Sequence, residues 1–154
     1  MSAVLSAPAP QMRDMHETDL AAVIEIEQSA YEFPWTPGIL RDCLRHGYIC
    51  QVLEVQGRVR GYGIVSIAAG ECHLLNICVR PADQRRGFGA MIVTALLALA
   101  STRGASAAFL EVRQSNAAAY RLYSRLGFNE IGVRPRYYPA RREREDAIVL
   151  AREL

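Results

Sequence analysis

The sequence contains no lysine, so its 18 side chains that are positively charged at pH 7 are all arginines. Its four cysteines show no Cys-x-x-Cys spacing and its three histidines form no paired ligand motif, so we expect no metal site. A formal net charge of +2 is too small to predict a nucleic-acid-binding surface. The longest strongly apolar run, residues 90–100, is too short to cross a bilayer. We therefore expect a cytoplasmic protein with reduced core thiols and neither nucleic-acid nor membrane partners.

Composition also predicts how the chain is organised. Residues 1–10 are rich in alanine, proline and serine, which predicts a disordered leader. They lack a cationic stretch followed by a long apolar one, so no secretory signal is expected. Residues 11–154 have the length and the 51% hydrophobic content typical of one globular domain.

Hydrophobic periodicity and turn residues predict seven strands and four helices in the remaining chain. The first helix follows Thr18 or Asp19, the second begins at Pro37 after the N-cap Thr36, and the fourth covers 116–126. The order of elements predicts an α/β fold with one central, mainly antiparallel sheet flanked by helices. The expected strands are 11–15, 48–55, 59–67, 71–79, 107–112, 129–134 and 147–151.

Residues 84–90, Gln-Arg-Arg-Gly-Phe-Gly-Ala, carry the most specific signal in the chain. They follow a strand-like run closed by Pro81 and open the third helix, whose apolar positions are 91, 92, 95, 96 and 99. A helix start attracts anions because its first N–H groups are unpaired. Two glycines allow a close approach of the backbone, and two arginines add forked donors. This segment therefore predicts a pyrophosphate-binding loop.

Two common nucleotide-binding motifs do not fit this loop. A P-loop requires a lysine, and a dinucleotide fingerprint requires a third glycine where Ile92 stands. The remaining pattern, Gln/Arg-x-x-Gly-x-Gly/Ala between a strand and a helix, resembles the acetyl-coenzyme A loop of the GNAT acetyltransferase superfamily. On these letters alone, a glycine-rich helix start with solvated arginines is the alternative interpretation.

The resemblance to GNAT enzymes extends over roughly residues 12–151. It is most specific for the bacterial ribosomal-protein-alanine N-acetyltransferases within that superfamily. Further motifs that match, in the same order along the chain, are Phe33-Pro34-Trp35, Leu75 to Pro81, Leu110 to Tyr120, Leu122-Tyr123, Leu126-Gly127-Phe128, Tyr137-Tyr138-Pro139 and Arg144 to Ala147.

This resemblance implies a GNAT fold whose sheet is splayed between its fourth and fifth strands, 71–79 and 107–112. Acetyl-coenzyme A would be the co-substrate, with its pantetheine arm between these strands and with no metal involved. Asn116 would contact it, although asparagine at a helix start is also a good cap. The implied cofactor-binding residues are Ile77, Cys78, Val79, Arg85, Arg86, Gly87, Phe88, Gly89, Ala90 and Asn116.

The resemblance also implies the residues that carry the chemistry. Glu111 matches the general base and Tyr123 the general acid that protonates the departing thiolate. Phe33, Pro34 and Tyr138 are implied substrate-binding residues, in loops that fold over the acceptor. A backbone N–H, most simply that of Val79, would polarise the thioester carbonyl.

The implied acceptor is the N-terminal alanine of small-subunit ribosomal protein eighteen. Its basic tail would favour an acidic lining, for which Glu32 and Asp42 are the candidates. Two alternatives stay open from the sequence. One is a GNAT enzyme for lysine side chains or small-molecule amines, and the other is a non-catalytic acyl-coenzyme A-binding module.

Overall fold

A computed structural model describes residues 9–154, so all but the last two residues of the expected leader 1–10 lie outside it. Seven strands and four helices form an α/β fold, together with two short 3-10 helices at Glu17–Asp19 and Pro81–Asp83. The elements are β1 (Gln11–Asp14), α1 (Leu20–Ala30), α2 (Pro37–Arg45), β2 (Ile49–Val55), β3 (Arg58–Ala68), β4 (Glu71–Val79), α3 (Phe88–Thr102), β5 (Ala107–Arg113), α4 (Ala117–Arg125), β6 (Asn129–Tyr138) and β7 (Glu145–Glu153).

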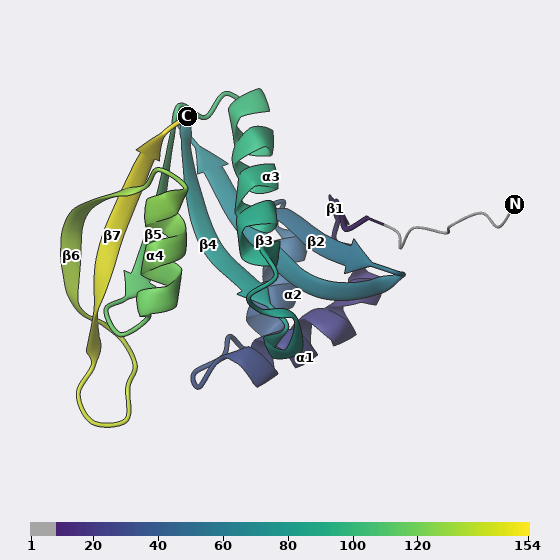
Figure 1. Cartoon of the computed structure of the whole chain (residues 1–154), viewed down its shortest axis with the longest axis horizontal. Helices are drawn as coiled ribbons and strands as arrows, with labels where there is room; N and C mark the ends of the chain where they lie inside the picture. Colours follow the sequence, from purple (N-terminus) through teal and green to yellow (C-terminus); the bar gives the residue numbers. More distant parts are fainter. Residues whose placement is uncertain (1–8) are drawn as a thin grey trace, which may run out of the picture.

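The seven strands form one sheet in the order β1-β2-β3-β4-β5-β7-β6. Every neighbouring pair is antiparallel except β4 and β5, which run parallel. The expected mainly antiparallel sheet flanked by four helices is therefore confirmed. Figure 1 shows the strands β5, β6 and β7, with α4, set apart from β1–β4.

The parallel pair β4–β5 stays together over only half of its length. Residues 71–74 of β4 pair with 107–110 of β5, and no further pairing follows. On the other side of β4, Asn76 pairs with Ile64 and Leu74 with Val65, so Leu75 is an extra residue in that ladder. Such a bulge bends its strand and increases the local twist. The bend lies where β4 leaves β5, and it opens the sheet there.

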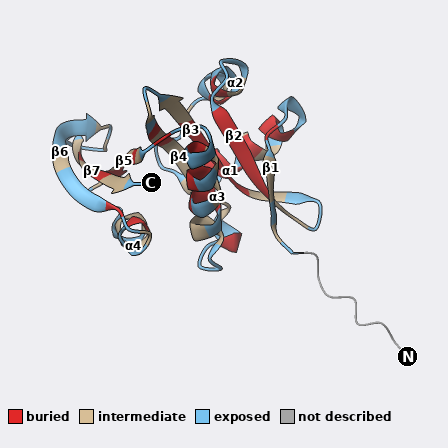
Figure 2. Ribbon diagram, turned by 90° about the horizontal axis from the view of Figure 1, so that it is seen from above, coloured by how far each residue is buried: buried red, intermediate tan, exposed pale blue. Residues whose placement is uncertain are grey.

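Helices cover the two faces of the sheet, and each face has its own apolar cluster. Ile92 and Leu96 of α3 and Tyr123 of α4 lie in one cluster. Val23 of α1 and Leu40 of α2 lie in the other. Figure 2 shows the buried residues concentrated along β2, β3, β4 and the inner sides of these helices. The four cysteines are reduced and buried, as expected.

Two glycines on β3 let α3 pack directly on the strand backbone. A Cβ atom added at Gly63 would lie 2.4 Å from Leu96 Cδ1 and 2.9 Å from Ile92 Cγ2. We predict that Gly63→Ala lowers the free energy of unfolding by about 1–3 kcal/mol, because it overpacks a closed core. Thermal and urea unfolding measure the effect. Gly132→Ala is the control, since nothing lies within 4 Å of its added Cβ, and a loss there as large as at Gly63 would contradict the packing explanation.

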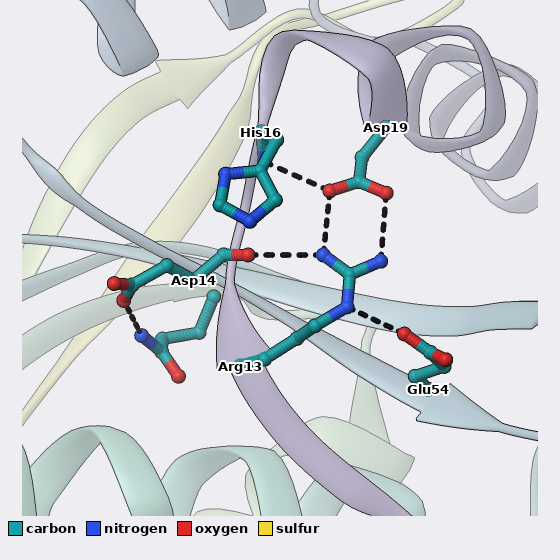
Figure 3. A network of polar contacts seen from close by, with 6 residues as sticks. Arg13, Asp14, His16, Asp19 and Glu54 are labelled. Atoms are coloured by element: carbon teal, nitrogen blue, oxygen red, sulfur yellow. Dashed lines mark hydrogen bonds and ion pairs between the residues drawn. The ribbon is translucent and has the colours of Figure 1, made fainter. Parts of the chain in front are cut away.

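An arginine network fixes β1 to the start of α1. Arg13 donates two hydrogen bonds to the Asp19 carboxylate, at 2.8 and 2.9 Å, and a third to Glu54 at 2.5 Å (Figure 3). The hydrogen bonds from Arg13 to Asp19 are the main reason that the pKa of Asp19 is lowered. Asp19 directly precedes α1, as the sequence predicts, but its carboxylate accepts the backbone N–H of His16 rather than one from α1.

Some details of the prediction are wrong. Met91, expected on the apolar face of the third helix, is 38% exposed. The last two strands are longer than predicted, and Tyr138 lies at the end of β6 rather than in a loop. Tyr138 pairs with Glu145 across the β6–β7 hairpin. These strand ends are rich in arginine and lack the alternation of apolar residues that predicts a strand. They are extended by backbone pairing between β6 and β7 instead.

Candidate active site

The splay between β4 and β5 forms the wall of a cavity of about 660 Å³. Its lining comes from β4, β5, the loop between α1 and α2, α4, and the end of β6. A smaller hollow of about 340 Å³ beside β1 and α1 contains none of the predicted site residues. The larger cavity brings together seven of them: Phe33, Pro34, Ile77, Glu111, Asn116, Tyr123 and Tyr138.

The register of β4 decides which backbone groups face the gap. The Arg80 N–H donates to the Arg60 carbonyl at 2.8 Å, and Cys78 lies opposite Tyr62. Alternate residues of an antiparallel strand direct their backbone groups the same way. Those of Cys78 therefore point to β3, and those of Ile77 and Val79 point toward the gap. The expected backbone contact of Cys78 is thus directed away from the cavity.

The start of α3 has the geometry of an anion site beside this gap. Gly87 is its N-cap, with φ of 80°, and no side chain caps the first N–H groups. Arg85 also has positive φ, 65°, which is uncommon outside glycine. Arg86 lies 3.6 Å from the buried carboxylate of Asp83, which tethers it at the loop. Residues 85–90, which the sequence predicts to bind the cofactor, lie outside the cavity lining.

Glu111 lines the cavity between two basic side chains. His73 Nε2 lies 2.5 Å from its Oε2, and Arg134 Nε lies 3.3 Å from its Oε1. The hydrogen bond with His73 is the main reason that the pKa of Glu111 is lowered, although burial opposes it. The Glu111 side chain is only 8% exposed. It is therefore an ionised carboxylate at neutral pH, held in one orientation.

Tyr123 reaches the same cavity from α4. Its ring is 9% exposed and packs edge-on against Phe128, with the ring centroids 5.7 Å apart. Burial raises the pKa of the phenol well above its ordinary value, so Tyr123 is protonated at neutral pH. Leu110 and Val112 face the cluster under α3 and α4. Glu111, between them on β5, points to the opposite face of the sheet.

Asn116 both lines the cavity and caps α4. Its side-chain oxygen accepts the backbone N–H of Ala119 at 3.1 Å. Capping is therefore established, while the contact with a cofactor stays a prediction.

At one end of the cavity an arginine lies between two aromatic rings. The Arg113 guanidinium carbon lies 4.5 Å from the ring centre of Tyr138 and 5.4 Å from that of Phe33. Glu32 also lines the cavity but is paired with Arg141. Asp42 lies outside the cavity lining, on an exposed part of α2. Of the two acidic residues expected to line the acceptor site, only Glu32 therefore lines the cavity, and its carboxylate is paired with Arg141.

A buried carboxylate that the sequence analysis missed also lines the cavity. Glu27 on α1 is 1% exposed and accepts hydrogen bonds from Tyr62 at 2.7 Å and Asn76 at 2.5 Å. Its second oxygen accepts the Trp35 backbone N–H at 3.4 Å, which ties the loop after α1 to the sheet. Helical periodicity could have predicted its burial, because Glu27 is four residues after the inward-facing Val23 and so lies on the same face of α1.

Neither a metal-binding cluster nor a membrane-spanning helix is found among residues 9–154. In that range no group of three or more His, Cys, Asp or Glu side chains is arranged to hold a metal ion. Within the same residues, none of the helices has the length and apolar character needed to span a bilayer.

Comparison with known proteins identifies the family of this chain. Residues 10–128 match the acetyltransferase (GNAT) family. The chain therefore belongs to the GNAT family of acetyltransferases. It is 42% identical over 134 residues to the ribosomal protein bS18-alanine N-acetyltransferase of Salmonella typhimurium, across 87% of this chain and 90% of the relative. The resemblance inferred from the sequence motifs is confirmed.

Solved structures show the same fold. The ribosomal-protein-S18-alanine N-acetyltransferase of Escherichia coli superposes with a TM-score of 0.88 at 37% identity, covering 94% of each chain. The acetyltransferase yncA from Salmonella typhimurium, solved with its cofactor acetyl-CoA, superposes with a TM-score of 0.82 at 22% identity, covering 96% of this chain and 95% of that one. The second likeness concerns the fold alone.

Proposed function

We propose that this protein transfers the acetyl group of acetyl-coenzyme A to the N-terminal α-amine of a protein, with the N-terminal alanine of ribosomal protein bS18 as acceptor. One observation carries the proposal. A carboxylate and a phenol, Glu111 and Tyr123, reach one cavity from opposite faces of a splayed parallel strand pair. An amine on one side of the gap and a thioester sulfur on the other would each meet a group suited to it.

The residues around the gap fit an extended, phosphate-bearing co-substrate. Acetyl-coenzyme A supplies a thioester, an amide-containing arm and a pyrophosphate. The N–H groups of Ile77 and Val79 point into the gap, where they can pair with such an arm as a neighbouring strand would. The Ile77 carbonyl already accepts a hydrogen bond from the Tyr31 hydroxyl at 2.7 Å, and the Val79 carbonyl accepts one from the Gln84 amide at 3.2 Å. The uncapped N–H groups of α3, with Arg85 and Arg86, suit the pyrophosphate.

Glu111 is proposed as the general base. An α-amine with a pKa near 8 is about one-tenth neutral at pH 7, whereas a lysine near 10.4 is below about one-thousandth neutral. A carboxylate of modest basicity, acting directly or through water, is therefore better matched to an N-terminus. Glu111 is ionised and lines the cavity, as this role requires.

Tyr123 is proposed as the general acid. Its phenol is protonated at neutral pH, so a proton is available for the departing thiolate. An ordinary phenol is a weaker acid than an ordinary thiol by about 1.5 pKa units, so full transfer is uphill by roughly 2 kcal/mol. Burial adds to that cost in this site. Donation of a hydrogen bond to the developing thiolate is the main contribution that we expect from Tyr123.

The acceptor end suits a small, extended N-terminus. Phe33, Pro34 and Tyr138 line the cavity there, and Arg113 joins the two aromatic walls. Aromatic walls with a few polar groups suit an extended N-terminus whose first residue is small, such as alanine. The relatives whose names specify bS18-alanine support this acceptor in particular.

The decisive experiment is acetylation of defined peptides with isotopically labelled acetyl-coenzyme A, followed by mass spectrometry. A peptide with the N-terminal sequence of bS18 is compared with the same peptide blocked at its α-amine, with a lysine-containing peptide and with a polyamine. Label on the free α-amine of the first peptide alone supports the proposal. Label on lysine or polyamine instead would make this a GNAT enzyme of another specificity. Cofactor binding with no transfer to any amine would indicate a binding module.

Replacing Arg85 and Arg86 together with alanine tests the pyrophosphate site. We expect the Kd for acetyl-coenzyme A to rise about 10- to 100-fold, because each charge-assisted hydrogen bond contributes about 1.5–3 kcal/mol and exposure reduces that. Calorimetry at two salt concentrations measures the Kd, and the salt dependence should weaken in the variant. Arg103→Ala, at the other end of α3, is the control. Equal affinities of the variant and the control would contradict this assignment.

A further inference from the structure

His73 contacts Glu111 from outside the cavity. It lies on β4 opposite Phe109 of β5, in the paired segment just before the strands separate. Its Nε2 lies 2.5 Å from Glu111 Oε2, whereas His73 is absent from the residues that line the cavity. Its side chain is 38% exposed, compared with 8% for Glu111. One end of this pair therefore meets solvent and the other end meets the cavity.

The two basic side chains beside Glu111 differ in whether their charge depends on pH. Arg134, on β6, is 3.3 Å away and keeps its charge at every accessible pH. Histidine ordinarily changes charge between pH 5 and 8. Tyr138 is the other titratable group that faces Glu111, and its phenol stays neutral because burial raises its pKa. Across β7, Glu111 faces the uncharged Val149.

No charged residue lies directly opposite His73 on the two neighbouring strands, and Glu71 lies two residues before it on the same face of β4. His73 pairs with Ser66 across β3 and with Phe109 across β5. The only ionised partner that its ring contacts among residues 9–154 is Glu111. Changes in the charge of His73 therefore act directly on that carboxylate.

We propose that His73 is a positioning residue that holds the Glu111 carboxylate in place and, through its own charge, sets how readily Glu111 accepts the proton of the acceptor amine. This inference rests on the proposed role of Glu111 as the base. When His73 is an imidazolium, it stabilises the carboxylate and weakens it as a base. When His73 is neutral, the hydrogen bond persists, the extra charge is gone, and Glu111 is a stronger base.

The test is a pair of pH profiles. In His73→Gln, the amide can still donate a hydrogen bond to Glu111, but it does not titrate. We expect the ratio of wild-type to H73Q kcat/KM for the bS18 peptide to rise roughly tenfold from pH 6 to pH 8, because an imidazolium weakens Glu111 as a base and the amide of H73Q carries no charge at either pH. Titration of the acceptor amine cancels in this ratio. His46→Gln, on an exposed histidine after α2, should give a flat ratio.

A second variant separates orientation from charge and guards against misfolding. His73→Thr suits a strand but is too short to reach Glu111. It should also give a ratio that rises with pH, with kcat at pH 8 roughly tenfold below that of H73Q because the carboxylate is no longer held. Affinity for acetyl-coenzyme A, measured by calorimetry, should stay within about twofold of wild type for both variants.

The outcomes distinguish this inference from the proposed function. Flat ratios for H73Q and H73T, with Glu111→Gln strongly impaired, would overturn the role of His73 and leave Glu111 as the base. Full activity of Glu111→Gln would overturn both. A rising ratio for H73Q but not for H46Q supports the proposal.

Discussion

Glu111→Gln is expected to lower kcat for the bS18 peptide by about 10²- to 10⁴-fold at pH 7, the range that general base catalysis contributes. Glutamine keeps the size of the side chain and removes its basicity. The deficit should shrink toward pH 9, because the α-amine is then mostly neutral and needs less help from a base. Because the pKa of Glu111 is lowered, its own titration lies below this pH range and does not cause the change.

Steady-state kinetics between pH 7 and pH 9 measure this effect, together with the Kd for acetyl-coenzyme A. The Kd should stay near the wild-type value, since the proposed cofactor contacts are made by other residues. Glu71→Gln, at the exposed start of β4, is a matched control and should leave kcat unchanged. A pH-independent loss, or none, would show that Glu111 is not the base.

Tyr123→Phe is expected to reduce kcat by about 10²- to 10³-fold, the loss associated with removing one donor from a developing negative charge. The fold should tolerate the change, because phenylalanine retains the edge-on packing against Phe128. We expect no hydrogen bond within residues 9–154 to be lost, since burial and the neighbouring Tyr138, and no hydrogen bond, account for the raised pKa of the Tyr123 phenol. Thermal unfolding should therefore change little, and acetyl-coenzyme A should still bind.

The neighbouring tyrosine provides the control for this variant. Tyr120 lies on the same helix and donates its hydroxyl to Glu130 at 3.1 Å, away from the cavity. Tyr120→Phe should keep kcat within about twofold of wild type, since surface changes are usually small. If Tyr123→Phe kept full turnover as well, the acid role would have to be abandoned. An acetyl-donor thioester whose thiol is more acidic than that of coenzyme A should partly rescue Tyr123→Phe, because its departing thiolate needs less protonation.

Local sequence was sufficient for most of the fold. The helix start at Pro37 follows from Thr36, whose hydroxyl accepts the Ile39 N–H at 3.2 Å, and from the fixed φ of proline. The position of α3 after the 84–90 loop is likewise readable from Gly87 and the apolar residues behind it. The ends of β6 and β7 could not be predicted from local sequence, because they are set by pairing with a partner strand rather than by their own apolar pattern.

The sequence predicted seven of the residues that line the cavity, and it predicted their arrangement only partly. Motif order along the chain identified Glu111 and Tyr123, and the structure places both in one cavity. His73 and Glu27 gave no comparable motif, since each acts through a partner distant in sequence: His73 through Glu111, 38 residues later, and Glu27 through Asn76, 49 residues later.

Sequence alone determined the kinds of element, their order and the family to which the chain belongs. These depend on short-range causes: periodicity, caps, glycine conformation and a loop whose letters fit one class of ligand. Tertiary structure decided which backbone groups of β4 face the gap, what surrounds Glu111, and how β6 is extended. Each of these depends on register, and a shift of one residue would turn every side chain of a strand to the other face.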